Sequence, residues 1–212
     1  MKLFDDLLDG YRRFRGGAWR TQRTRWTELA GGQSPQVMVI ACSDSRVDPA
    51  QIFDVDPGEI FVVRNVAALV PPFETTPGHH GVSAALEFAV QFLKVREIVV
   101  MGHGLCGGCK AALTQEMQGE EPGSGGFIAD WIDMLDDARE EVVARHGTEG
   151  RTAERAMEQA GVKVSLANLR SFPCVAELES RGQLRLRGAF FAISDGVLHI
   201  LDEGTGCFAP VE

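Results

Sequence analysis

The stretch from Gln36 to Arg46 reads QVMVIACSDSR and carries the first strong signal in the chain. Its run from Val37 to Cys42 is apolar without alternation, which predicts a short strand covered on both faces. The polar cluster that follows, Ser43 to Arg46, begins where that strand ends. In open α/β sheets, ligands bind at the carboxyl ends of parallel strands. The stretch therefore predicts a buried strand that leads into a functional site.

This polar cluster, with the cysteine before it, combines a thiol, a carboxylate and a guanidinium. Cys42 and Asp44 are two residues apart, so on extended chain their side chains project to the same side and can face one ion. Arg46 is close enough to pair with Asp44. Taken alone, the segment is equally compatible with a buried structural cysteine and a salt bridge in a loop.

A second stretch, Glu97 to Cys109, reads EIVVMGHGLCGGC and repeats the pattern of an apolar run followed by polar residues. Its His103 and Cys106 are three residues apart, and the glycines around them allow a tight turn from strand to helix in which both side chains converge. Together with Cys42 and Asp44 they offer two sulfurs, one nitrogen and one oxygen. Zinc accepts such a set in tetrahedral geometry, whereas calcium and magnesium prefer oxygen alone, so we predict a zinc site.

Several segments of the chain resemble the β-class carbonic anhydrases. They are ACSDSRVDP (41–49), PGEIFVVRNVAALVPP (57–72), HHGVSAALEFAV (79–90), MGHGLCGG (101–108) and, more weakly, SLANLRSFPCV (165–175). The combination of C-x-D-x-R with a later H-x-x-C is highly specific to that family. The resemblance covers most of residues 33 to 200.

This resemblance implies an enzyme that uses zinc-bound hydroxide to hydrate carbon dioxide reversibly to bicarbonate and a proton. Cys42, His103 and Cys106 would be permanent zinc ligands. Asp44 would either occupy the fourth position and close the site, or pair with Arg46 and accept a hydrogen bond from the zinc water. Because a guanidinium–carboxylate pair holds Asp44 off the metal, loss of Arg46 should close the site.

The resemblance also assigns residues around the substrate. Gly107 would offer a backbone N–H at a helix N-terminus, where anions are favoured. The remaining substrate-binding candidates are Gln33, which would donate to a substrate oxygen, and the pocket walls Phe61, Val66 and Phe88. Phe88 stands where the family often has tyrosine.

The chain resembles the plant-like, type I-like subgroup because it lacks most of the second anion site, called the bicarbonate lock, of some bacterial relatives. In those relatives, a tryptophan, an arginine and a tyrosine surround the anion. Here Arg64 is present, but Val39 and Phe191 stand in the other two positions. We therefore expect no lock.

Composition sets limits on the architecture and the partners. A chain of 212 residues with no linker rich in Pro, Ser or Gly predicts a single domain, divided into a helical arm (1–32), a zinc-site α/β core (33–120) and C-terminal helices and edge strands (121–212).

A net charge of −9 argues against nucleic-acid partners. No apolar run spans a bilayer, the N-terminus lacks a signal-peptide pattern, and the five cysteines form no disulfide framework, so we expect a cytoplasmic protein.

The order of predicted elements indicates an α/β fold with a mainly parallel central β-sheet, flanking helices, an N-terminal helical arm and C-terminal antiparallel edge strands. The expected strands are 37–42, 59–65, 97–101, 184–193 and 197–201, and the strand 59–65 is also expected to be buried. The expected helices are 48–54, 76–93, one that starts near 105, 127–145 and 152–180. The last of these is expected to be interrupted near Gly161 or Pro173. In the family, such N-terminal helices pack on a neighbouring subunit, which implies a homodimer or homotetramer. Packing on the chain's own core is the alternative.

Three other functions fit part of the pattern. Cys106 and Cys109 form a C-x-x-C at a predicted helix start, as in thiol–disulfide oxidoreductases, but a redox role leaves Cys42, Asp44 and His103 without a purpose. A noncatalytic zinc-stabilised domain would not explain Arg46. An enzyme with the same fold and metal could instead hydrolyse another small heteroallene, such as carbon disulfide.

Overall fold

The structure is a computed structural model that describes residues 3–212, and it contains two compact units. One unit ends at Ser34, and the other is Pro35–Glu212. The predicted single domain, with its internal boundaries after residues 32 and 120, stays a prediction.

The first unit consists of three consecutive helices, which confirms the helical arm. They are α1 (Phe4–Gly16), α2 (Ala18–Thr21) and α3 (Arg23–Leu29). Within the unit, the rings of Phe14 and Trp26 meet edge to face with centroids 5.7 Å apart. Helix α1 exposes large apolar side chains, including Phe4, Leu7 and Tyr11. Helix packing inside the unit therefore leaves an apolar face uncovered.

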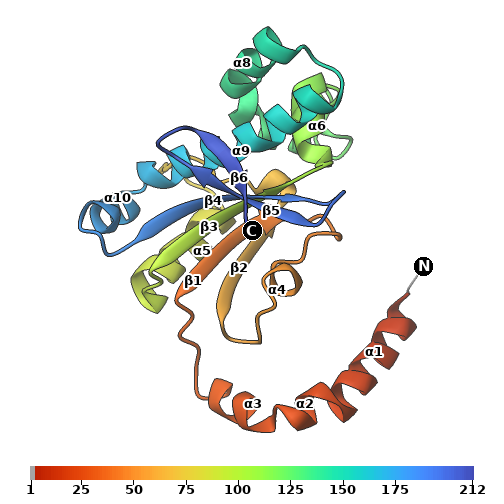
Figure 1. Ribbon diagram of the computed structural model, residues 1–212, viewed down its shortest axis with the longest axis vertical. Coiled ribbons are helices and arrows are strands. Elements are labelled where there is room, and N and C mark those ends of the chain that lie inside the picture. Colours follow the sequence, from red (N-terminus) through yellow and green to blue (C-terminus); the bar gives the residue numbers. More distant parts are fainter. Residues whose placement is uncertain (1–2) are drawn as a thin grey trace. The chain divides into compact units, whose positions relative to one another are not determined.

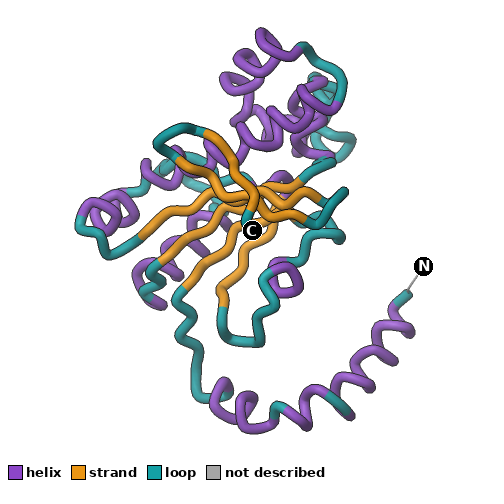
Figure 2. Tube along the Cα trace, in the orientation of Figure 1, coloured by secondary structure: helices purple, strands orange, loops and turns teal. Residues whose placement is uncertain are grey.

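The second unit is built on one six-stranded sheet of order β2-β1-β3-β4-β5-β6 (Figures 1 and 2). The strands are β1 (Val37–Cys42), β2 (Ile60–Asn65), β3 (Glu97–His103), β4 (Arg185–Ala192), β5 (Val197–Asp202) and β6 (Cys207–Pro210). The pairs β1–β2, β1–β3 and β3–β4 are parallel, whereas β4–β5 and β5–β6 are antiparallel. The predicted fold class is confirmed, and β6 is an additional edge strand that the sequence did not reveal.

Burial distinguishes the two strands that were both predicted to be buried. In β1, Met38 to Cys42 are buried, as a central parallel strand requires. The prediction for β2 was wrong, since no residue of this strand is fully buried and 37% of Val62 is exposed. The reason is position: β2 is the first strand in the sheet order and pairs along one edge only.

The helices of the second unit follow the predicted order with shifted boundaries. They are α4 (Pro49–Ile52), η1 (Val66–Ala68), α5 (Gly81–Glu87), the π-helical η2 (Phe88–Leu93), α6 (Gly107–Thr114), α7 (Gly126–Ile132), η3 (Asp133–Leu135), α8 (Asp136–His146), α9 (Arg151–Ser171) and α10 (Pro173–Ser180). The break predicted within 152–180 falls at Phe172, ahead of Pro173, while Gly161 lies inside α9. Within residues 3–212, no helix combines the length and apolarity needed to cross a bilayer.

Helix α9 packs closely against the carboxyl end of β3, and Gly102 makes this approach feasible. A Cβ added at Gly102 would lie 2.6 Å from the Val162 Cγ2 and 3.4 Å from the backbone oxygen of Glu158. The absence of a side chain therefore lets α9 lie directly beside the residue that precedes His103.

We predict that Gly102→Ala lowers the free energy of unfolding by about 1–3 kcal/mol, the range for an overpacked interior. Urea denaturation at fixed protein concentration measures this. Gly81→Ala is the control, because a Cβ there would meet no atom of the described chain within 4 Å outside its immediate surroundings. Equal unfolding midpoints for wild type and Gly102→Ala would contradict the close approach.

Candidate metal centre

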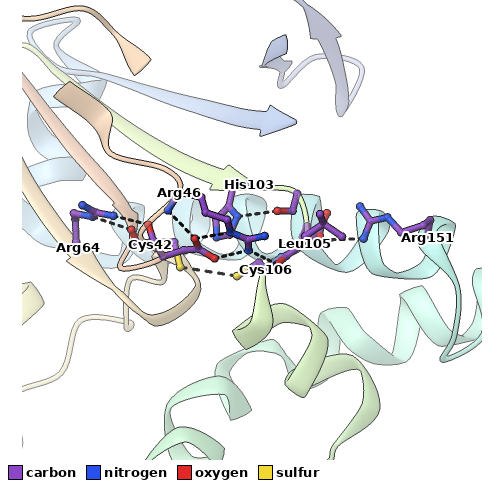
Figure 3. A network of polar contacts seen from close by, with 10 residues as sticks. Cys42, Arg46, Arg64, His103, Leu105, Cys106 and Arg151 are labelled. Carbon is purple, nitrogen blue, oxygen red and sulfur yellow. Dashed lines mark hydrogen bonds and ion pairs between the residues drawn. The ribbon is translucent and has the colours of Figure 1, made fainter. Parts of the chain in front are cut away.

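Three side chains converge where β1 and β3 end. Cys42 is the last residue of β1 and His103 the last of β3, while Cys106 is the N-cap of α6. Because β1 and β3 are adjacent and parallel, their ends meet at the same edge of the sheet. All three side chains are buried, with 6%, 1% and 2% of their residue surfaces exposed. Figure 3 shows the three residues grouped around one point.

The distances in this cluster suit a metal ion. The Cys42 and Cys106 sulfurs are 4.0 Å apart, close to the about 3.8 Å expected for two sulfurs on tetrahedral zinc. One ligand atom from each of the three residues lies within 4.8 Å of the others. His103 Nδ1 donates to the Gly104 carbonyl at 2.9 Å, so Nε2 carries the free lone pair. That Nε2 is buried without a hydrogen-bond partner among residues 3–212, as expected of an atom directed at a metal.

The thiols of this cluster hold their protons until a cation replaces them. The neighbouring Cys106 thiol, together with burial, raises the pKa of Cys42 to about 12. The Cys109 thiol, itself buried, raises the pKa of Cys106 to about 12. Zinc binding at this site must therefore release protons, and the donor set of two sulfurs and one imidazole nitrogen fits zinc.

The carboxylate of Asp44 is turned to Arg46. Arg46 Nε donates to Oδ1 at 2.9 Å, Nη2 donates to Oδ2 at 2.6 Å, and the backbone N–H of Arg46 also donates to Oδ1 at 2.9 Å. This guanidinium holds the pKa of Asp44 well below its usual range. Of the two predicted arrangements, the structure contains the pair with Arg46. Asp44 as a direct metal ligand stays a prediction.

Arg64 fixes the backbone that carries Cys42 and Asp44. Its Nε donates to the Cys42 carbonyl at 2.9 Å, its Nη2 donates to the Asp44 carbonyl at 2.6 Å, and its Nη1 donates to Asp48 Oδ2 at 3.0 Å. The sequence had suggested only an anion site for Arg64. Its position opposite Ala41 in the β1–β2 register brings the guanidinium within reach of this loop.

Two of the predicted substrate-binding residues lie beside the metal cluster. Val66 follows β2 directly, and a Cβ added at Gly108 would fall 2.7 Å from its Cγ1. Gly107, the first residue of α6, follows Cys106 in the chain. The structure thus brings Val66 and the start of α6 together at this edge of the sheet.

Phe61 and Phe88 lie elsewhere in the second unit. Their ring centroids are 5.9 Å apart, so they contact each other. Phe61 pairs with Met38, and Asn65, four residues later, pairs with Cys42. At about 3.3 Å per residue this places Phe61 about 13 Å along the strand from the level of Cys42. Gln33 belongs to the first unit, so its contact with substrate stays a prediction.

A buried residue beside the metal cluster that the sequence analysis did not single out is Glu158 on α9. Only 3% of its surface is exposed, and its Oε1 accepts a hydrogen bond from the Cys106 N–H at 3.3 Å. The signal that could have found it is a glutamate within the buried stripe of α9, which continues through Gly161, Val162 and Ser165.

Comparisons with known proteins agree with this geometry. A family model described as "Carbonic anhydrase" matches residues 37–198. A carbonic anhydrase from Pseudomonas aeruginosa is 37% identical over 207 residues, covering 97% of this chain and 91% of the relative. The solved structure of the β-carbonic anhydrase CcaA has a TM-score of 0.89 and 30% identity, covering 98% of this chain and 92% of that one. The tetrameric β-carbonic anhydrases of Sordaria macrospora include a chain with a TM-score of 0.79 and 29% identity, with coverages of 97% and 98%.

We predict that the purified protein holds about one zinc per chain and that His103→Ala loses most of it, because metal affinity depends on every ligand. Metal analysis after dialysis against a chelator measures the content. His199→Ala is the matched control, since His199 lies on β5 and contacts Arg155. Full zinc occupancy in His103→Ala would show that this imidazole is not a ligand.

Proposed function

The chain belongs to the β-class carbonic anhydrase family, and we propose that Cys42, His103 and Cys106 hold its zinc while Asp44 and Arg46 keep the site open. The enzyme catalyses the reversible hydration of carbon dioxide to bicarbonate and a proton, with zinc as cofactor. The observation that carries the residue assignment is the convergence of three buried ligand atoms at one sheet edge, beside a carboxylate held by a guanidinium.

Zinc, when bound, supplies a Lewis acid that lowers the pKa of water from 15.7 to about 7, which makes hydroxide available at neutral pH. The chain's own residues do the rest. Cys42, His103 and Cys106 would supply three donors to the metal, and Arg46 holds the Asp44 carboxylate so that it does not act as a further donor. The ionised Asp44 can accept a hydrogen bond from the attacking O–H group and so orient it. The backbone N–H of Gly107, at the start of α6, favours the negative charge that develops on the product.

The alternative functions are not favoured. A thiol redox role for Cys106 and Cys109 does not account for the cluster of Cys42, His103 and Cys106. Hydrolysis of carbon disulfide would use the same site, but the matching family and its curated relatives are described as carbonic anhydrases.

We propose that the chain assembles into a homodimer or homotetramer. Support comes from α1, where Phe4, Leu7, Tyr11 and Phe14 recur at spacings of three and four residues and are all exposed, as on a helix face awaiting a partner. Phe88 and Phe92, also exposed, stack with centroids 5.7 Å apart. Since Phe61 and Phe88 lie away from this chain's metal cluster, a role in walling a substrate pocket requires a second copy to bring them there.

We propose a reducing compartment such as the cytoplasm. All five cysteines are free thiols, and two of them must ionise to hold zinc. An oxidising compartment would expose such ligands to disulfide exchange whenever the metal dissociates.

Arg46→Gln is predicted to lower the carbon dioxide hydration rate about 10- to 100-fold without loss of zinc. Hydrogen bonds between charged groups are worth about 1.5–3 kcal/mol, and losing them frees Asp44 to take the fourth position. Stopped-flow hydration assays on zinc-quantified protein measure the rate. The matched control is Arg170→Gln, which removes an arginine whose ion pairs are with Glu179 and Glu203. An unchanged rate in Arg46→Gln would refute the gating role.

Deleting residues 1–28 is predicted to give monomer or aggregate in place of the native oligomer. The reason is that α1 presents an apolar face that another subunit would cover. Light scattering measures the molar mass. Leu7→Ser with Tyr11→Ser keeps the helix but removes two of its apolar side chains, so this variant should weaken assembly in the same direction. An unchanged oligomer after the deletion would rule out this role for the arm.

A further inference from the structure

Glu158 is a buried polar group whose hydrogen-bonding capacity is only partly used. Within residues 3–212 the buried polar side chains are those of His103, Glu158 and Ser165. Ser165 is satisfied, because its Oγ donates to the Ala68 carbonyl and accepts the Val70 N–H, each at 3.2 Å. Glu158 Oε1 accepts the Cys106 N–H, but its Oε2 is buried without a hydrogen-bond partner in this part of the chain. A side chain that is costly to bury therefore sits directly against a metal ligand.

Glu158 and Arg46 bind opposite sides of the peptide group between Leu105 and Cys106. Arg46 Nη2 donates to the Leu105 carbonyl at 3.1 Å, and the N–H of the same peptide group, that of Cys106, donates to Glu158. Figure 3 shows Arg46, Leu105 and Cys106 in line, with Arg151 beyond them. Leu105 has a φ of +60°, a conformation that residues with a Cβ rarely adopt. Two opposed hydrogen bonds therefore fix a peptide with an unfavourable backbone conformation.

We propose that Glu158 is a positioning residue of the metal site, which orients the Leu105–Cys106 peptide so that the Cys106 sulfur faces the zinc and the Leu105 carbonyl meets Arg46. The inference rests on the proposed assignment of Cys106 as a ligand. The role depends on the length of the Glu158 side chain, because its oxygen must extend from α9 to the Cys106 N–H. Hydrogen bonds in such a chain polarise and support one another.

Arg151 holds the carboxylate from the solvent side. Its Nη1 lies 3.6 Å from Glu158 Oε1, and it also pairs with Glu154 one turn earlier on α9. The Arg151 side chain is about half exposed, whereas that of Glu158 is 2% exposed. Glu154 is thus a matched reference, because it shares Arg151 with Glu158 and lies on the same helix, four residues before it.

The test separates reach from charge with three substitutions at Glu158. Glu158→Gln keeps an oxygen at the same reach without charge. Glu158→Asp keeps the charge but withdraws the oxygen by one methylene. Glu158→Leu removes the acceptor with little change in volume. Zinc release from the loaded protein to a colorimetric chelator at neutral pH is the measurement, with thermal unfolding recorded in parallel.

We expect Glu158→Gln to release zinc at close to the wild-type rate, and Glu158→Asp and Glu158→Leu to release it about 10- to 100-fold faster, the range typical for outer partners of metal ligands. Ser165→Ala is a control for the loss of any buried polar side chain on α9. Glu154→Gln is a control for the loss of an ion-pair partner of Arg151. Both controls should release zinc at the wild-type rate, even where unfolding shifts.

Three results would overturn the proposal: wild-type release in Glu158→Asp and Glu158→Leu, faster release from Glu158→Gln than from Glu158→Asp, or an equal acceleration in Ser165→Ala. If Glu158→Leu does not fold, the order of the Gln and Asp variants decides. The two hypotheses fail separately. Wild-type protein that binds no zinc would refute the proposed metal site, whereas zinc-loaded protein indifferent to Glu158 would refute only the positioning role.

Discussion

The structure depends on two parallel strands, β1 and β3, that lie side by side and end at the same edge of the sheet. Their alignment brings Cys42 and His103 together although the two residues are far apart in the sequence. The turn after β3 then adds Cys106 within one helical N-cap. Because the strands are buried in the interior of the unit, the spacing of these ligands is set by rigid packing rather than by a loop. A one-residue slip between the strands would turn ligands away from the site.

Hydrogen bonds to backbone groups hold the segments between these strands and the helices. Arg64 donates hydrogen bonds to the carbonyls of Cys42 and Asp44, and Arg46 donates one to the carbonyl of Leu105. Near the site the chain also contains three residues with positive φ that are not glycine, namely Ala67, Ala68 and Leu105. Conformations of this kind cost about 1–3 kcal/mol each and persist only where the surroundings determine them. The arginines are therefore part of the framework as well as of the chemistry.

Local patterns in the sequence predicted the parts of this protein that local physics determines. The unbroken apolar runs identified β1 and β3, the Asp48-Pro49 pair identified α4, and the spacing of Cys42, Asp44, His103 and Cys106 identified the metal and the ligand candidates. Asp48 does cap α4, accepting from the N–H groups of Ala50 and Gln51. What the sequence did not reveal depends on contacts across the fold. Neither the edge position of β2 nor the separation of Phe61 from Cys42 is visible in a strand's own residues. Glu158 follows Cys106 by 52 residues in the sequence. The two residues come into contact only because α9 packs against β3 at Gly102.

That distance along the chain has a consequence for how the enzyme acquires its metal during synthesis. On a ribosome, Cys42, His103 and Cys106 emerge well before α9 and β4, the elements that pack on β3 and brace its turn. Contacts between remote segments form slowly, because closing long loops costs entropy before it yields any packing. An ion that arrives early meets only flexible thiols and an imidazole, and it can leave again. Durable metal binding therefore requires that α9 and β4 have already packed on β3, which cannot happen before their residues have been synthesised.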